Sequence, residues 1–190
     1  MAQQVEIEFN NSLTKSEYTK LLSSLNLSEK DFYLQENYYY DTKDWKLKKL
    51  HSALRIRLFS DSAELTLKTP TGKDFLETTD NLSLKQGKLL LNTHTIKLDG
   101  YVAKQLIELN VNLKELFLFG SLVTKRYEKK IEQGLIVIDE SSYGSKTDYE
   151  LEFETNSREV GEVYFDHLLQ LYSIKKRSTK NKIKRMMESS

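Results

Sequence analysis

Acidic and basic side chains recur at every second position in separate short runs of this chain. Glutamates alternate with apolar residues in Val5–Phe9 and again in Tyr149–Glu154, and arginines do so in Leu54–Leu58. In a β-strand alternate side chains share a face, so each run places like charges on one side. Two like charges about 7 Å apart repel by roughly 0.6 kcal/mol in water and about 2 kcal/mol at an effective dielectric of 20. Groups of opposite charge should therefore meet each of these faces.

This sorting by sign favours a binding site over an ordinary solvated surface. An amphipathic strand with one face in water is the plain alternative, but a solvated face usually mixes acids with bases to avoid repulsion. Carboxylate oxygens are the ligands that Mg²⁺ and Mn²⁺ prefer, and arginine offers a planar fork to phosphate oxygens. The sequence therefore predicts a metal-binding end and a phosphate-binding end of one site.

The composition limits the classes of protein that can carry such a site. Of the 190 residues, 38% are hydrophobic, which suffices for a sizeable core, and no linker divides the chain, so we expect a single domain over residues 1–190. A charged fraction of 30% with a net charge of only +1 argues against nucleic acid or a membrane surface as a partner. The absence of cysteine excludes disulfides and thiolate metal sites and, without an apolar N-terminal segment, predicts a cytoplasmic location.

The elements that must position these charges are mostly strands. Alternation and turn residues predict strands near 5–9, 37–41, 54–58, 63–68, 75–78, 118–127, 134–139 and 149–154. A capping box at Thr14–Glu17 predicts one helix, apolar spacing predicts another over 160–171, and two or three more are expected within 80–117. Such an order indicates one large antiparallel sheet. If it closed on itself, its charged faces could turn inward and its apolar faces outward under the helices.

A set of motifs spread in order over nearly the whole chain resembles a known family. The motifs are Glu6-x-Glu8, Tyr40-Asp41-Thr42, Leu54-Arg55-Ile56-Arg57, Thr66-Leu67-Lys68, Asp139, Glu150-x-Glu152 and Asn181-Lys182. They resemble the CYTH domain of the triphosphate tunnel metalloenzymes, in particular its small bacterial YjbK-like branch. The resemblance implies an α+β fold: an eight-stranded antiparallel closed barrel with a polar lumen and helices packed on the outside. It also implies a bound triphosphate chain with one or two divalent cations, Mg²⁺ or Mn²⁺.

Roles for individual residues follow from this resemblance. The expected metal ligands are Glu6, Glu8, Asp139, Glu150 and Glu152. The expected triphosphate-binding residues are Arg55, Arg57, Lys68, Arg126 and Lys182. Glu77 is expected to orient Arg57 and Lys68 by ion pairing, with a direct part in catalysis as the alternative. Glu154 is expected either to contact the metal site or to end its strand in solvent. The rest of the basic C-terminal segment is expected to be solvated.

The implied activity is metal-dependent hydrolysis of inorganic triphosphate or a small organic triphosphate. Two alternatives stay open: a non-catalytic module that binds nucleotides or polyphosphate, and a class IV-type adenylate cyclase. The family's usual opening, ExExK, has a lysine where this chain has Asn10, so roughly 1 to 3 kcal/mol of charge-assisted contact is missing. Tyr38, Tyr39 and Tyr40 could stack on a base or thiazole ring, or serve packing alone.

Overall fold

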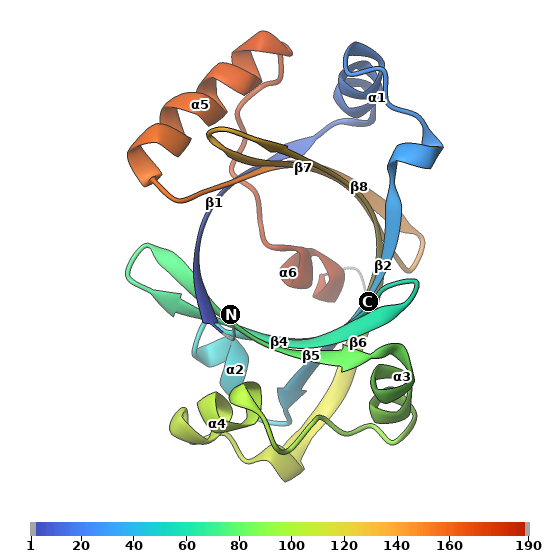
Figure 1. Ribbon diagram of the computed structural model, residues 1–190, viewed down its shortest axis with the longest axis vertical. Coiled ribbons are helices and arrows are strands. Elements are labelled where there is room, and N and C mark those ends of the chain that lie inside the picture. The colour runs from blue at the N-terminus through green and yellow to red at the C-terminus, as the bar shows by residue number, and fades with distance from the viewer. Residues whose placement is uncertain (1–2, 189–190) are drawn as a thin grey trace. The chain divides into compact units, whose positions relative to one another are not determined.

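The computed structural model describes residues 3–188 and contains eight strands in one closed barrel, in the order β1-β5-β4-β3-β2-β6-β7-β8. The strands are β1 (Gln3–Leu13), β2 (Tyr33–Thr42), β3 (Ala53–Leu58), β4 (Ser62–Thr71), β5 (Asp74–Ser83), β6 (Leu116–Ile131), β7 (Gly134–Tyr143) and β8 (Lys146–Thr155). The helices are α1 (Lys15–Ser24), α2 (Lys46–Lys49), α3 (Leu84–Asn92), α4 (Tyr101–Glu108), α5 (Arg158–Leu171) and α6 (Lys182–Met187) (Figure 1). The α+β fold and the closed eight-stranded antiparallel barrel predicted from sequence are confirmed.

The described residues group into two compact units. The first contains Gln35–Leu122 together with the start of β1, and the second contains Glu6–Leu34 together with the residues from Val123 onward. None of the helices within residues 3–188 has the length and apolar character that crossing a bilayer requires.

In the first unit, period-two alternation on β3 and β4 separates an apolar face from a charged one. Leu54, Ile56 and Leu65 lie in the buried core, which α3 and α4 cover on one side of β4 and β5 (Figure 1). The start of α4 is fixed by the buried Asp80 carboxylate, which accepts hydrogen bonds from the backbone N–H groups of Tyr101 and Val102, each at 3.0 Å. Capping of this kind satisfies backbone donors that a helix leaves unpaired.

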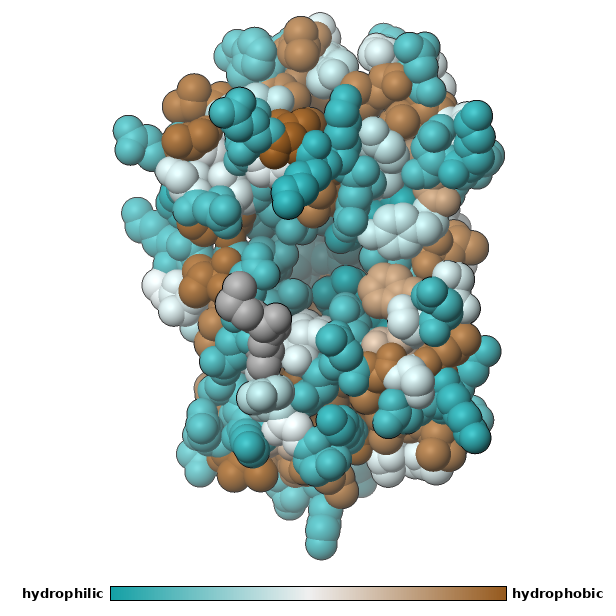
Figure 2. Space-filling view, viewed as in Figure 1, coloured by the Kyte–Doolittle hydropathy of each residue, from teal (hydrophilic) through white to brown (hydrophobic). Residues whose placement is uncertain are grey.

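In the second unit, the same alternation places Ile138, Leu151 and Phe153 in a core under α1 and α5. These two helices lie on one side of β7 and β8, whereas α6 lies on the other (Figure 1). The predicted capping box of α1 is present, with reciprocal hydrogen bonds between Thr14 and Glu17. Hydrophobic side chains also appear on the surface over α5, where Val160, Val163 and Leu171 are exposed (Figure 2).

The segment between α5 and α6 is tied to β1 by a fully buried amide. Asn11 donates to the Lys175 carbonyl at 3.0 Å and accepts from the Arg177 backbone N–H at 2.6 Å. One residue later, the Ser12 backbone N–H donates to Thr179 Oγ1 at 2.8 Å. These contacts direct the chain from the apolar side of the unit to the charged side, where α6 begins.

Candidate active site

The predicted metal ligands of the second unit share one face because of strand register. Asp139 on β7 lies opposite Glu150 on β8, and Glu154 lies opposite Glu8 on β1. Glu152, two residues from Glu150, is on the same face. Asp139, Glu150 and Glu152 are all buried, with at most 6% of each residue exposed. A buried carboxylate is costly unless a cation or hydrogen-bond donors meet it.

Arg126 on β6 meets two of these acids. It grips Asp139 with two parallel hydrogen bonds, from Nε at 2.8 Å and from Nη2 at 2.7 Å, and Nη2 also donates to Glu152 at 3.0 Å. A guanidinium suits such a bidentate contact better than a lysine ammonium does, because its N–H donors form a rigid fork. Burial by itself would lower the pKa of Arg126, but Asp139 and Glu152 raise it well above its usual value.

The last helix brings two more cations to the same carboxylates. Lys182 donates to Asp139 and to Glu152, and its Nζ lies 3.4 Å from Glu150. Arg185 donates to Glu150 and, at 3.0 Å, to Asp148. Burial lowers the pKa of Lys182, yet the three acids around it raise that pKa overall. The basic C-terminal segment, expected from sequence to be mostly solvated, therefore supplies buried partners of the acidic face.

Burial, with a smaller contribution from neighbouring acids, raises the pKa of two of these glutamates. Burial first, and then the negative charge of Glu6, raise the pKa of Glu154 to about 8 despite the opposing charge of Arg126. Burial also raises the pKa of Glu152 to about 7, against the effect of Lys182. Asp139 behaves in the opposite way: burial would raise its pKa, but Arg126 and Lys182 hold it far below the usual range. Burial and neighbouring acids thus favour the protonated forms of Glu152 and Glu154, whereas Asp139 stays ionised.

Asn10 occupies the position where a lysine is usual in the resembled family. It lies opposite Glu152 in the pairing of β1 with β8, and its Nδ2 donates to Glu8 Oε1 at 3.0 Å. The amide hydrogen-bonds this acid without bringing a charge.

The arginines of the first unit form ion pairs with glutamates of the same unit. Arg55 Nη2 lies 3.2 Å from Glu77 Oε1, and Arg57 Nη1 lies 3.1 Å from Glu64 Oε1. Lys68 stands opposite Glu77 in the pairing of β4 with β5. Glu77 therefore pairs with Arg55, a partner that the sequence pattern did not indicate, and it lies directly opposite Lys68, which the pattern did indicate.

Comparison with known proteins decides the family. The model of the CYTH domain family matches residues 4–187 of this chain. The chain belongs to the CYTH family. The Bacillus subtilis CYTH relative "Putative triphosphatase YjbK" is 45% identical over 188 residues, covering 99% of this chain and 97% of that protein.

Solved structures agree with this CYTH assignment. A Bacillus halodurans structure, named a "putative adenylate cyclase", superimposes with a TM-score of 0.93 at 39% identity and covers 97% of this chain and 98% of its own. The Hippeastrum protein HpAC1, for which a dominant triphosphatase activity is stated, has a TM-score of 0.76 at 23% identity, with 97% and 96% covered. At 23% identity, the similarity to HpAC1 supports the fold alone and does not indicate a shared activity.

The CYTH family implies a divalent metal cofactor, and the donor set of the second unit fits one in chemistry. Its carboxylate oxygens are hard ligands, and a bound cation would oppose the burial and acid–acid effects that raise the pKa of Glu152 and Glu154. Within residues 3–188, however, no group of three or more histidine, aspartate or glutamate side chains is already gathered as a metal-binding set. Arg126, Lys182 and Arg185 engage Asp139, Glu150 and Glu152 instead.

Sequence reasoning missed two charged partners, Glu64 and Arg185. Glu64 was recoverable because it lies two residues before Thr66, on the face that carries Lys68. Arg185 follows Lys182 by three residues, a spacing that places both on one side of a helix. The spacing of Lys182 and Arg185 is informative only when residues 182–187 are known to form a helix.

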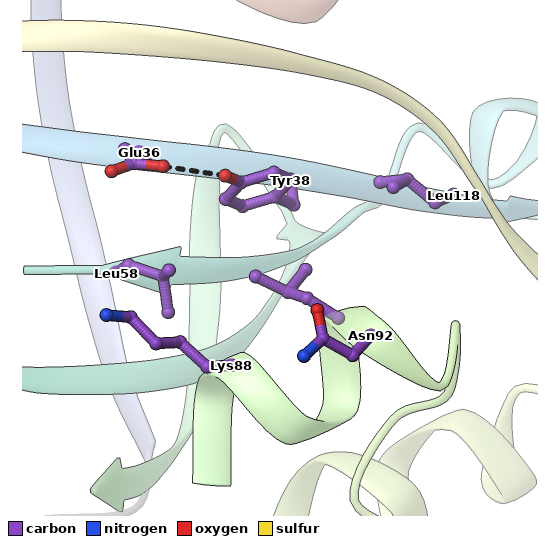
Figure 3. Close-up of a pocket in the computed structure, with 7 residues that line it drawn as sticks. Glu36, Tyr38, Leu58, Lys88, Asn92 and Leu118 are labelled. Atoms are coloured by element: carbon purple, nitrogen blue, oxygen red, sulfur yellow. Dashed lines mark hydrogen bonds between the residues drawn. The ribbon is translucent and has the colours of Figure 1, made fainter. Parts of the chain in front are cut away.

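A separate cavity in the first unit lies on the apolar side of its sheet. It has a volume of about 390 Å³ and is lined by Glu36, Tyr38, Leu58, Lys88, Leu91, Asn92 and Leu118 (Figure 3). Tyr38 donates to Glu36 at 2.6 Å, and this hydrogen bond together with burial raises the pKa of Tyr38 to about 12. The cavity contains none of the predicted metal ligands or triphosphate-binding residues, although Tyr38 is one of the three tyrosines considered for stacking on a ring.

Proposed function

We propose that this CYTH protein is a divalent-metal-dependent triphosphatase that acts on inorganic triphosphate or a small organic triphosphate. The observation that carries the proposal is the buried acidic face of the second unit, on which Asp139, Glu150 and Glu152 are held together. A purely structural sheet has little need of these acids and their buried cationic partners, because well-packed apolar residues of similar volume stabilise a fold as well or better. The 45% identity to the named triphosphatase of B. subtilis supports the same activity.

In this proposal the acids hold the cofactor and the bases hold the substrate. Glu6, Glu8, Asp139, Glu150 and Glu152 would be the metal ligands, and Glu154 would adjust their charge. A bound Mg²⁺ or Mn²⁺ supplies charge neutralisation at the phosphate oxygens and an activated water. Arg55, Arg57 and Lys68 bind phosphate oxygens, with Glu77 orienting Arg55. Arg126 and Lys182 hold the acids in place and add positive charge for the phosphates.

The chemistry needs no protein nucleophile. Water oxygen bonds to the terminal phosphorus while the bridging oxygen departs with the diphosphate, and catalysis consists of positioning and charge stabilisation. The cationic side chains would neutralise the charge that gathers on the departing group. Because disulfides are typical of oxidising compartments and this chain can form none, we also propose that it works in the cytoplasm.

The test is phosphate release from tripolyphosphate, thiamine triphosphate and ATP, each with Mg²⁺ and with Mn²⁺. We expect turnover of at least one substrate, and a loss of about 100-fold or more in Glu8→Gln, which removes one proposed ligand charge. Glu162→Gln is the matched control, since this glutamate is exposed on α5 and should leave activity unchanged. Cyclic AMP formation from ATP would identify a cyclase instead.

One observation favours a second candidate, a binding module without turnover. Asn10 replaces a charged residue at the family's lysine position and hydrogen-bonds Glu8. Loss of that charge removes transition-state stabilisation more readily than binding, because several other bases remain for the phosphates. Tight, metal-dependent triphosphate binding with no product from any of the three substrates would establish this candidate and exclude the hydrolase.

A further inference from the structure

A cluster of four aromatic rings adjoins the arginine face of the first unit. Tyr39 on β2 lies directly opposite Arg55 on β3, so the two side chains share a face. The Tyr39 and Phe119 ring centroids are 6.4 Å apart, and Trp45 stands edge-on to Phe119 at 5.2 Å and to Phe117 at 6.0 Å. The aromatic surface thus continues the row that contains the proposed phosphate-binding arginines.

The aromatic cluster is more exposed to solvent than the hydrophobic core is. Tyr39 is buried, but Trp45, Phe117 and Phe119 each keep an intermediate share of their surface open to solvent. The buried residues of the same unit, such as Leu54 and Ile56, lie on the opposite face of the sheet. Three half-open rings beside charged groups are suited to stacking on a planar ligand.

The backbone at Trp45 is held in a conformation that a bulky side chain rarely adopts. Its φ of 59° and ψ of 45° are left-handed. The Trp45 N–H donates to the Thr42 carbonyl at 2.8 Å, and the buried Asp41 carboxylate accepts from the backbone N–H groups of Leu47 and Lys48 at 2.9 and 3.0 Å. Strain of this kind persists where surrounding contacts enforce it, and it is concentrated at functional sites.

The positive charge of Lys48 beside the Trp45 indole favours stacking of a neutral ring over a positively charged one. Lys48 Nζ lies 5.4 Å from the Trp45 ring centroid, in cation–π range. A second cation, such as a thiazolium, would be repelled by this ammonium, whereas a neutral base would not. The same lysine would attract the phosphate end of a ligand.

We propose that Trp45, Phe117 and Phe119 form a subsite for the neutral base of a nucleoside triphosphate whose phosphates are bound by Arg55 and Arg57. This inference rests on the triphosphate-binding function proposed above and narrows its substrate class from any triphosphate to one that carries a base. The subsite sets specificity, and it takes no part in breaking the phosphoanhydride bond.

The chain contains a single tryptophan, so tryptophan emission, excited at a wavelength that tyrosine does not absorb, reports on Trp45 alone. ATP added with Mg²⁺ should quench this emission saturably, whereas tripolyphosphate, with binding followed by calorimetry, should leave it nearly unchanged. Trp45→Leu should weaken ATP binding by about 5- to 100-fold, the range expected for losing one stacked base, and leave tripolyphosphate affinity within about twofold. Phe119→Leu should act in the same direction. Tyr101→Leu, an equal change at an exposed ring on α4, should alter neither affinity.

Unchanged tripolyphosphate binding in Trp45→Leu shows that the variant is folded. If that variant and Phe119→Leu bind ATP as the parent does, the subsite is refuted while the triphosphate function stands. If thiamine triphosphate binds more tightly than ATP and loses that advantage in Trp45→Leu, the assignment to a neutral base is wrong. If the parent protein binds neither ATP nor tripolyphosphate, the proposed function fails together with the subsite.

Discussion

Lys182 on α6 pairs with Asp139 on β7, an acid whose two oxygens Arg126 already holds. Residues far apart in sequence thus place two cations against one fully buried carboxylate. The arrangement keeps Asp139 ionised, and it fixes α6 to the charged face of the second unit. It also means that a metal ion must compete with protein cations for the same oxygens.

Removing the guanidinium group of Arg126 should strongly lower the free energy of unfolding. Arg126→Met leaves Asp139 and Glu152 with one fewer partner in a buried setting, and breaking such a network costs about 3 to 5 kcal/mol. Urea denaturation measures the change. Lys125→Met is the control, because Lys125 pairs with the largely exposed Glu29 and should cost less than about 1 kcal/mol. Equal losses in the two variants would contradict a special role for Arg126.

Competition between α6 and the metal predicts the behaviour of Arg185→Gln. This change removes one of the two cations near Glu150, so Mg²⁺ should bind about 10- to 100-fold more tightly, a charged hydrogen bond being worth about 1.5 to 3 kcal/mol. Calorimetric titration with Mg²⁺ gives the dissociation constant. Lys184→Gln makes the same charge change at an exposed position of α6 and should have little effect. Weaker Mg²⁺ binding in Arg185→Gln would refute the competition.

The pair formed by Glu17 and Arg177 should make stability depend on acid pH. Burial would raise the pKa of Glu17, but hydrogen bonds from Arg177, Thr14 and the Lys175 backbone lower it to about 2. The unfolded chain, with a pKa near 4.5, binds more protons between these values, so this stabilisation is complete above about pH 4.5 and is lost as pH falls toward 2.

Glu17→Gln isolates this contribution. At pH 6 the variant should be less stable than the parent by about 1 to 2 kcal/mol, after allowance for solvent screening of a partly exposed pair, and the difference should shrink as pH falls to 3. Urea midpoints across this range measure it. A difference that stays constant from pH 6 to pH 3 would show that ionisation of Glu17 is not its source.

Restoring the family's lysine should increase catalysis. Asn10→Lys places a cation opposite Glu152 and beside Glu8, where about 1 to 3 kcal/mol of charge-assisted contact would raise kcat/KM for tripolyphosphate by about 5- to 100-fold. Steady-state phosphate release measures the gain. Asn10→Gln keeps an uncharged amide and should give none. A lysine variant no faster than the glutamine variant would rule out the missing charge as a limit on activity.

Gly161 should resist substitution although it lies inside a helix. A Cβ there would come within 2.4 Å of Thr155 Cγ2 and 2.6 Å of Phe9 Cε2, so Gly161→Ala should lower the free energy of unfolding by about 1 to 3 kcal/mol. Thermal or urea unfolding measures this. Val163→Ala on the same helix, at a residue that is 71% exposed, should change stability by less than about 0.5 kcal/mol. Stabilisation by Gly161→Ala would mean that helix propensity outweighs the crowding.

Local rules were enough to predict the elements and their faces. Period-two alternation put Glu150 and Glu152 on one side of a strand and Leu151 on the other, because that geometry is a property of any extended chain. The capping box at Thr14 and Glu17 needed only four consecutive residues. The ordered motifs then indicated the CYTH family, and the family implied a closed barrel. The pattern of alternation by itself did not decide whether the sheet closes.

Only the tertiary structure decided which charges meet. The pairing of Glu77 with Arg55 depends on strand register and side-chain reach, and the contacts of Lys182 and Arg185 depend on a helix that follows an irregular segment anchored by Asn11. A buried ion pair forms wherever long-range packing brings opposite charges together out of water, and no local pattern encodes that distance. The sequence by itself therefore determined what kinds of groups line each face, and the fold determined their partners.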